Sequence, residues 1–180
     1  MAGPVFFPNS WIGKQLDFDW PQPSGWKTIK KVMEDSWQLT LRDVENPLLG
    51  GPKVSFTVAV FLCNNLNHPG EEAYIKICKQ VPHHGTEFES QAVRRDQVGE
   101  REHPEIEIYK LFLEKEARHL PICLGYKMEH QGDHDPIPGC YVHYVAYKKL
   151  SGLRIDETWY LSLRNSQHKA ICAAFLSAYR

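Results

Sequence analysis

The sequence has almost no net charge. Its 21 basic and 22 acidic residues give a formal charge of −1, and the pI is near 6.7. Binding to nucleic acid or to an anionic membrane surface relies on concentrated positive charge, which this composition does not provide. We therefore expect no nucleic-acid partner and no membrane partner.

The sequence also lacks targeting and membrane-spanning segments. Residues 1–10 have neither the basic start nor the long apolar core of a secretory signal. No stretch approaches the roughly 20 apolar residues that a spanning helix requires. These absences favour a cytoplasmic or nuclear protein over a secreted one.

The cysteines and histidines show no metal-binding spacing. None of the five cysteines forms a C-x-x-C pair, and four lie in or beside apolar segments, which favours buried free thiols. Among the nine histidines, His130 and His134 are closest to a regular spacing, but Gly, Asp and Pro around them disfavour a helix. We expect these two, with His83 and His84, to be solvated loop residues, and we expect no metal.

Two alternating segments predict a β-hairpin. Residues 54–62 are rich in β-branched and aromatic residues with a period of two, and residues 72–78 place an alanine and two isoleucines on one face. Asparagines and a Pro-Gly pair between them favour a turn. Because side chains alternate along a strand, Lys76 points away from the isoleucines, together with Tyr74 and Cys78.

A helix and a strand are expected after this hairpin. Residues 105–118 follow a proline and repeat apolar side chains at helical spacing, with Glu105 on the same face. Residues 139–147 predict a strand, and a helical tail follows a break at 150–152. The fold class is therefore α+β, a small, mainly antiparallel sheet with a packed helix and a C-terminal helical segment.

The two remaining regions carry weaker patterns. Residues 1–52 contain four of the five tryptophans and several prolines, with residues 37–42 as a candidate first strand. We expect an N-terminal extension whose tryptophans pack on the sheet; a partner-binding strip is the alternative. Residues 81–103 combine Pro, Gly and many charges and are expected to form a mobile loop.

The order of these elements resembles the N-terminal, ATP-binding lobe of the protein-kinase-like superfamily, and is most similar to the divergent kinase-like proteins common in filamentous fungi. The resemblance covers roughly residues 54–180 and is carried by the lysine in Glu72-Ala-Tyr-Ile-Lys-Ile-Cys78, the helix and the break at Leu150-Ser-Gly152. Residues 124–126 resemble the fourth strand of the lobe, and residues 141–147 resemble the fifth. The resemblance divides the chain into the extension, a lobe with its hinge (53–152) and the helical start of a second lobe (153–180).

The resemblance also implies functional roles. Lys76 would contact the nucleotide phosphates and Glu105 would hold that lysine, with Glu107 as the alternative. The hinge that meets adenine would consist of Lys148, Lys149 and Leu150. ATP is the implied ligand, and the sequence indicates no other cofactor.

The sequence departs from this family at its catalytic parts. Gly50-Gly51 is the only trace of a glycine-rich phosphate loop, and Tyr74 replaces the usual alanine. Nothing after residue 152 is similar to the His-Arg-Asp or Asp-Phe-Gly motif, whose carboxylates position substrate and Mg²⁺. Residues 130–135 are similar to the His-Gly-Asp motif of small-molecule phosphotransferases, but a polar turn explains them better.

These observations predict a catalytically incomplete, pseudokinase-type module with at most weak nucleotide binding and an interaction or scaffold role. Two alternatives stay open: the N-terminal part of an ATP-dependent phosphotransferase that needs a second lobe, and a small-molecule-binding protein of an unrelated α+β fold. The last helix keeps an apolar face to its final residues. We therefore expect an interrupted chain that self-associates or binds a protein through this helix.

Overall fold

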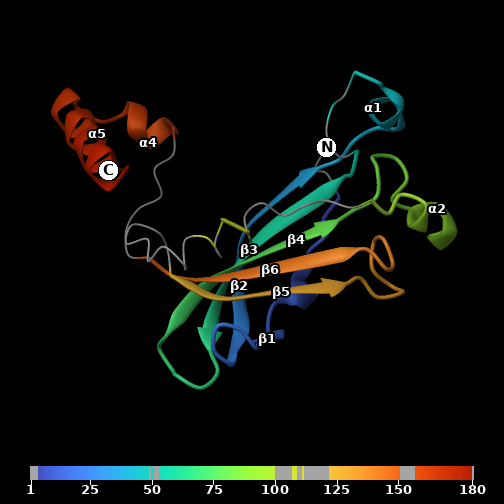
Figure 1. Cartoon of the computed structure of the whole chain (residues 1–180), viewed down its shortest axis with the longest axis horizontal. Helices are drawn as coiled ribbons and strands as arrows, with labels where there is room; N and C mark the ends of the chain where they lie inside the picture. Colours follow the sequence, from blue (N-terminus) through green and yellow to red (C-terminus); the bar gives the residue numbers. More distant parts are fainter. Residues whose placement is uncertain are drawn as a thin grey trace.

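Alternating burial along extended segments builds one antiparallel sheet. The computed structural model describes residues 4–48, 50, 53–99, 107, 108, 111, 122–150 and 157–179. Their sheet has six strands in the order β1-β2-β3-β4-β6-β5 (Figure 1). The strands are β1 (Gln15–Phe18), β2 (Ser24–Trp37), β3 (Phe56–Asn65), β4 (Glu72–Gln80), β5 (Cys123–His130) and β6 (Tyr141–Lys148). The helical elements are the 3₁₀ turn η1 (Asn9–Trp11), α1 (Leu41–Glu45), α2 (Gln91–Arg95), α4 (Glu157–Leu161) and α5 (Asn165–Tyr179).

The predicted hairpin is confirmed by β3 and β4. Val60 lies opposite Lys76 in the register, and the burial of both strands alternates. Phe61, Ile75 and Ile77 are fully buried on one face. The other face, with Val60 and Lys76, is half-buried. The sheet therefore has one core face and one partly solvated face.

The predicted first strand at residues 37–42 is wrong. Strand β2 ends at Trp37, and Thr40 starts α1 through a capping box with Asp43. The threonine hydroxyl accepts a backbone N–H at the helix start, so this local bond competes with extended pairing. Charged residues interrupt β2 and hid its strand character, although it pairs with β3 along its length; they are Lys27, Lys30, Lys31, Glu34 and Asp35. Residues 15–37 thus belong to the same sheet as the predicted lobe.

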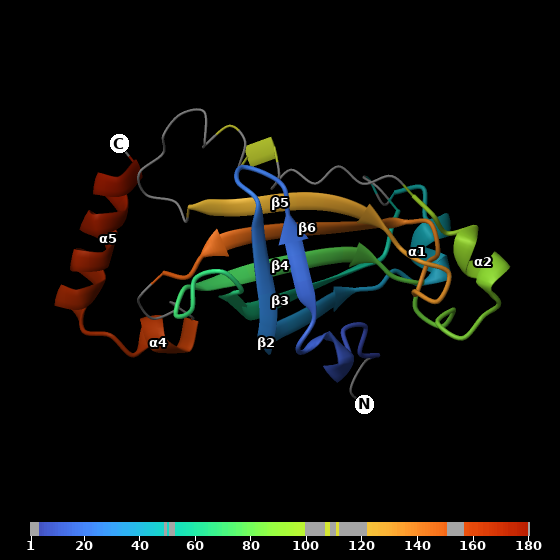
Figure 2. The same cartoon turned by 90° about the horizontal axis from the view of Figure 1, so that it is seen from below.

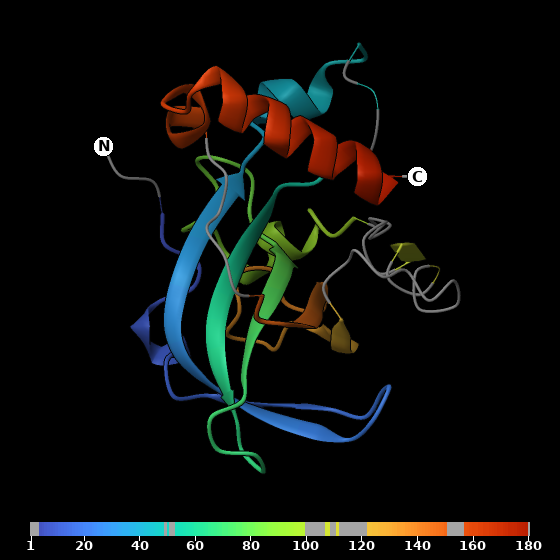
Figure 3. The same ribbon diagram turned by 90° about the vertical axis from the view of Figure 1, so that its left-hand side faces the viewer.

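The sheet is curved until its two edges approach each other. Strand β2 has register shifts between Thr28 and Lys30 and between Lys31 and Met33, and such bulges bend a strand. Figure 3 shows the β1–β2 hairpin swinging away from the long β2–β3 ribbon. Strand β1 thereby packs near β5, at the opposite edge. The result is a six-stranded, nearly barrel-shaped sheet.

Aromatic residues from the N-terminus fill the concave side. Phe7 and Trp26 are almost completely buried, and Trp11 packs against the same cluster. The Phe7 ring meets the Phe61 ring edge-on, with centroids 5.9 Å apart. The expected packing of N-terminal tryptophans on the sheet is confirmed for Trp11 and Trp26, whereas Trp37 is 64% exposed.

A polar cap closes one end of the sheet. It combines residues 81–99, including α2, with the turn between β5 and β6, and Figure 2 shows them side by side. Arg94 Nη1 donates to the Pro136 carbonyl at 2.6 Å, and Arg95 pairs with Asp133 at 2.8 Å. The polar turn predicted at 130–135 is confirmed, since β5 ends at His130. Of the loop expected at 81–103, residues 81–90 are confirmed as loop, whereas residues 91–95 form α2, whose Arg94 and Arg95 bind the β5–β6 turn.

The predicted helical tail is confirmed by α4 and α5. Both are drawn apart from the sheet (Figures 1 and 2), and Phe175 and Leu176 are exposed. Of the helix expected at 105–118, Glu107, Ile108 and Leu111 are described, and all three are helical. Within the described ranges, no helix combines the length and apolar character needed to cross a bilayer.

Closure of the sheet depends on Gly125, because a Cβ there would lie 2.8 Å from Cβ, Cγ and Cδ1 of Phe18. We expect Gly125→Ala to lower the free energy of unfolding by about 1–3 kcal/mol, since β1 and β5 would be forced apart. Urea unfolding measures this change. Gly132→Ala is the matched control, with its nearest neighbour at 3.6 Å; equal loss in both variants would contradict the role of the close approach.

Candidate functional site

Lys76 lies near the middle of the sheet on its half-buried face. In the register it is flanked by Val60 of β3 and Val145 of β6. Tyr74 shares this face, and its ring centroid is 6.0 Å from that of Tyr147, its partner on β6. As predicted, Lys76 points away from the isoleucines of β4, and its setting is a partly apolar surface rather than open solvent.

The predicted hinge directly follows the strand that borders Lys76. Lys148 ends β6, and Leu150 is 57% exposed. The backbone N–H of Lys149 donates to the Glu72 carbonyl, and its Nζ donates to Glu72 Oε2 at 2.6 Å. The side-chain hydrogen bond raises the pKa of Lys149. The hinge segment is therefore fastened to the start of β4, the same strand that carries Lys76.

The predicted carboxylate partner is not placed by the structure. Glu105 lies outside the described residues, and Glu107, the alternative, is helical with an exposed side chain. A lysine held by a helix carboxylate therefore stays a prediction for this site.

A second lysine, Lys79, was missed by the sequence reasoning. It lies on the core face of β4, between Thr57 and Val142 in the register, and is only 3% exposed. Burial lowers its pKa to about 8, although Asp135 and Glu34 act in the opposite direction. Alternation along the strand could have revealed this burial, because Lys79 lies on the same face of β4 as Ile75 and Ile77.

Aromatic rings cover the ammonium of Lys79. Its Nζ lies 4.5 Å from the centroid of the Phe7 ring and 5.5 Å from that of Trp11. Lys14 lies over the same indole at 4.1 Å. The negative face of an aromatic ring attracts a cation, so these contacts partly replace the water that Lys79 has lost.

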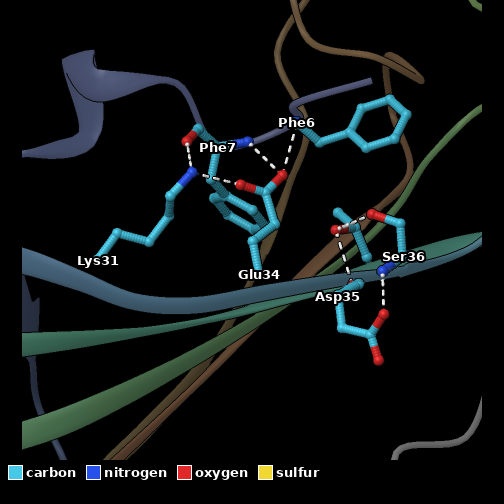
Figure 4. Close-up of polar contacts among 7 residues, drawn as sticks. Phe6, Phe7, Lys31, Glu34, Asp35 and Ser36 are labelled. Atoms are coloured by element: carbon cyan, nitrogen blue, oxygen red, sulfur yellow. Dashed lines mark hydrogen bonds and ion pairs between the residues drawn. The ribbon is translucent and has the colours of Figure 1, made fainter. Parts of the chain in front are cut away.

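A charged pair on β2 holds the covering segment in place. Figure 4 shows Glu34 and Lys31 pointing toward the backbone of Phe6 and Phe7. Glu34 Oε1 accepts from the N–H of Phe6 at 2.7 Å and of Phe7 at 3.1 Å. Lys31 Nζ donates to the Phe7 carbonyl at 2.7 Å and pairs with Glu34. One carboxylate and one ammonium thus bind three backbone groups of the bend that precedes η1.

His83 is a buried structural residue, so the expectation that it is a solvated loop histidine is wrong. It is 4% exposed, and its Nδ1 lies 2.9 Å from Ser55 Oγ, which also accepts the N–H of Leu39. Burial lowers the pKa of His83. Ser55 is fully buried, which makes it inaccessible as a nucleophile. His84, His130 and His134 are exposed, as predicted.

The thiols offer no reactive or metal-binding centre in the described ranges. Cys63, Cys78, Cys123 and Cys140 are buried and unbridged, as expected, and Cys172 is exposed. Burial raises the pKa of Cys63 to about 12, so its nucleophilic thiolate is not formed near neutral pH. Where the structure is described, no three His, Cys, Asp or Glu side chains gather as a metal site.

A shallow polar cleft lies away from both lysines. Its volume is about 270 Å³, and its lining comes from the β1–β2 hairpin and the β3–β4 turn, including Asp17, Asp19 and Asn67. It contains neither a buried charged group nor a basic residue. We therefore assign no chemistry to it.

Comparison with known proteins adds no relative: no family model, no curated protein and no solved structure matches this chain.

The buried histidine makes a testable contribution to pH dependence. The folded-state pKa of His83 lies below its ordinary value of 6.5, so the unfolded chain binds the proton more readily. This contribution to stability is complete above pH 6.5 and is lost as the pH falls through the folded pKa. We expect His83→Asn to reduce the fall in unfolding free energy below pH 6.5, measured by urea unfolding from pH 8 to 5. The exposed His84→Asn is the control, and parallel curves for the parent and His83→Asn would contradict the assignment.

Proposed function

We propose that this protein is a catalytically incomplete, kinase-like module that binds a nucleotide weakly and acts mainly through protein interaction. The observation that carries the proposal is the pairing of β4 with β6. Lys76 lies on the first strand and the hinge segment follows the second. In the proposed site, the lysine contacts the phosphates of the nucleotide and the hinge contacts its base. The lysine and the hinge must therefore lie on, or directly after, neighbouring strands.

The order of the elements supports the same proposal. A hairpin carries the lysine, the described helical residues lie between it and the next strand, and β5 and β6 then pair before the hinge. Consistency across several elements is stronger support than a single short motif. Strand β1 and the N-terminal aromatic segment are additions to this arrangement, on the face opposite Lys76.

The face around Lys76 favours weak binding. Tyr74 occupies the position where the common motif has alanine, and it pairs with Tyr147 across β4 and β6. An adenine at this face would stack on a phenol ring instead of lying flat beneath a small residue. Base stacking on an aromatic ring contributes only about 1–3 kcal/mol.

Phosphoryl transfer is not part of the proposal. Residues 153–180 contain no His-Arg-Asp or Asp-Phe-Gly motif, whose aspartates would position a phosphoacceptor and bind Mg²⁺. The residues described there, in α4 and α5, include exposed apolar side chains instead, among them Leu161, Phe175 and Leu176. Such residues on a helix surface favour contact with another protein.

A thermal-shift titration with ATP, with and without Mg²⁺, measures nucleotide binding. A ligand that binds only the folded state at ten times its Kd adds about 1.4 kcal/mol of stability, which raises the midpoint. We expect Lys76→Ala to abolish this rise. Lys30→Ala, which changes an exposed lysine of β2, should retain it. No rise in the parent, or an equal rise in Lys76→Ala, would refute the nucleotide site.

Sedimentation velocity measures the proposed interaction role, with a second copy of the chain as the partner. We expect self-association that weakens in Phe175→Glu, because a charge would replace an apolar side chain that is 66% exposed. Ser177→Glu adds the same charge at an exposed polar position of α5 and should have a smaller effect. A parent that stays monomeric at the highest concentration would rule out association through this helix.

A further inference from the structure

The strongest unassigned feature is the cation inside the curved sheet. Lys79 is 3% exposed, and a segment of the chain, residues 6–11, closes over it. We call this segment the aromatic lid, since it contributes Phe6, Phe7 and Trp11. Lys79 and Lys76 are on opposite faces of β4, so a site at Lys79 would be independent of the proposed nucleotide site.

Lys79 lacks the polar partner that a buried cation normally has. In the part of the chain that the structure describes, its ammonium makes ring contacts but no hydrogen bond and no ion pair. Burying a cation in this way is unfavourable unless an anion or a hydrogen-bond acceptor compensates it. An apolar side chain at this position would serve the stability of the fold better.

The nearby carboxylates are occupied elsewhere. Glu34 binds Lys31 and the backbone of the lid. Asp135 accepts the N–H of Gly132 at 2.8 Å. Lys14 Nζ, 4.1 Å from the centroid of the Trp11 ring, adds another positive charge near the same indole. Among the described residues, these carboxylates therefore leave Lys79 without a direct ion-pair partner.

The space beneath the lid is shaped for aromatic rings. Phe7 and Trp11 both pack against Phe61, with centroid distances of 5.9 and 6.0 Å. The lid is attached through a small set of polar contacts, namely the bonds from Lys31 and Glu34 and a bond from Thr28 Oγ1 to the Trp11 carbonyl. Its displacement would leave a ring-sized apolar space beside one ammonium.

We propose that the interior beneath the aromatic lid is a binding site for an aromatic carboxylate, whose ring replaces a lid ring against Phe61 and whose carboxylate pairs with Lys79. The Lys31–Glu34 pair acts as the latch, because it holds the lid backbone closed (Figure 4). Without ligand, the aromatic rings of the lid fill this site, and the ligand displaces them.

Covalent trapping on the whole chain tests this site directly. The probe is 2-formylbenzoate with cyanoborohydride, because its aldehyde stands next to the carboxylate that would pair with Lys79. The Lys79 amine attacks the aldehyde carbon, water leaves to form an imine, and hydride from cyanoborohydride reduces it to a stable secondary amine. We expect modification at Lys79, located by mass spectrometry of the digested chain, to saturate with probe concentration. Benzoate should suppress it, and benzaldehyde, which lacks the carboxylate, should modify Lys79 roughly tenfold less, since the charge pairing is lost.

Matched variants separate a binding role from a structural one. Glu34→Gln, with Lys31→Met as the second latch variant, should raise the modification rate at Lys79 several-fold because the lid is held less tightly. Lys79→Met should lose the modification and be at least as stable as the parent, since a buried charge is removed. Lys76→Met, on the other face of β4, should leave modification at Lys79 unchanged.

The opposite results would overturn the proposal. Modification spread over exposed lysines, without saturation and without protection by benzoate, would show that no carboxylate site exists. A clear loss of stability in Lys79→Met would show that the cation serves to hold the lid through its ring contacts. The saturation and protection measurements use the parent sequence. They therefore test the carboxylate site even where a latch variant fails to fold.

Discussion

Burial of the N-terminal aromatic rings against the concave side of the sheet is the interaction on which the rest of the structure depends. Phe7, Trp26 and Phe61 are buried almost completely, and burying one such side chain contributes about 1.5–3 kcal/mol. The sheet must curve to enclose them, which brings β1 toward β5 and requires a glycine where the two meet. Curvature, closure and the internal position of Lys79 all result from this packing.

One strand carries two lysines with different chemistry. Lys76 and Lys79 are three positions apart, so their side chains leave opposite faces of β4. The first lies on the half-buried face, beside the strand that leads to the predicted hinge. The second is enclosed, and burial lowers its pKa to about 8. A strand can in this way present a half-buried lysine on one face and a fully buried lysine on the other.

The two proposed ligand sites use the sheet from opposite sides. Nucleotide binding depends on the β4–β6 pairing and on the hinge. Carboxylate binding depends on the aromatic lid and its latch, whose charged groups come from β2. The polar cap, with the buried pair of Ser55 and His83, joins the loop after β4 to the sheet. The proposed protein interaction uses a third region, the exposed side of α5 with Phe175 and Leu176.

The hairpin, the polar turn, the helical tail and the buried cysteines were predictable from the sequence because period-two burial, turn residues and apolar neighbours are local signals. Strand β2 was not, since its charged residues mask its pattern and its pairing with β3 replaces the missing local preference. Likewise, Lys76 and its orientation were predictable from alternation along one strand. Only tertiary structure decided that Phe7 and Trp11 enclose Lys79 and that His83 is buried, because these contacts join segments far apart in the chain, and no local pattern encodes which segment closes over which face.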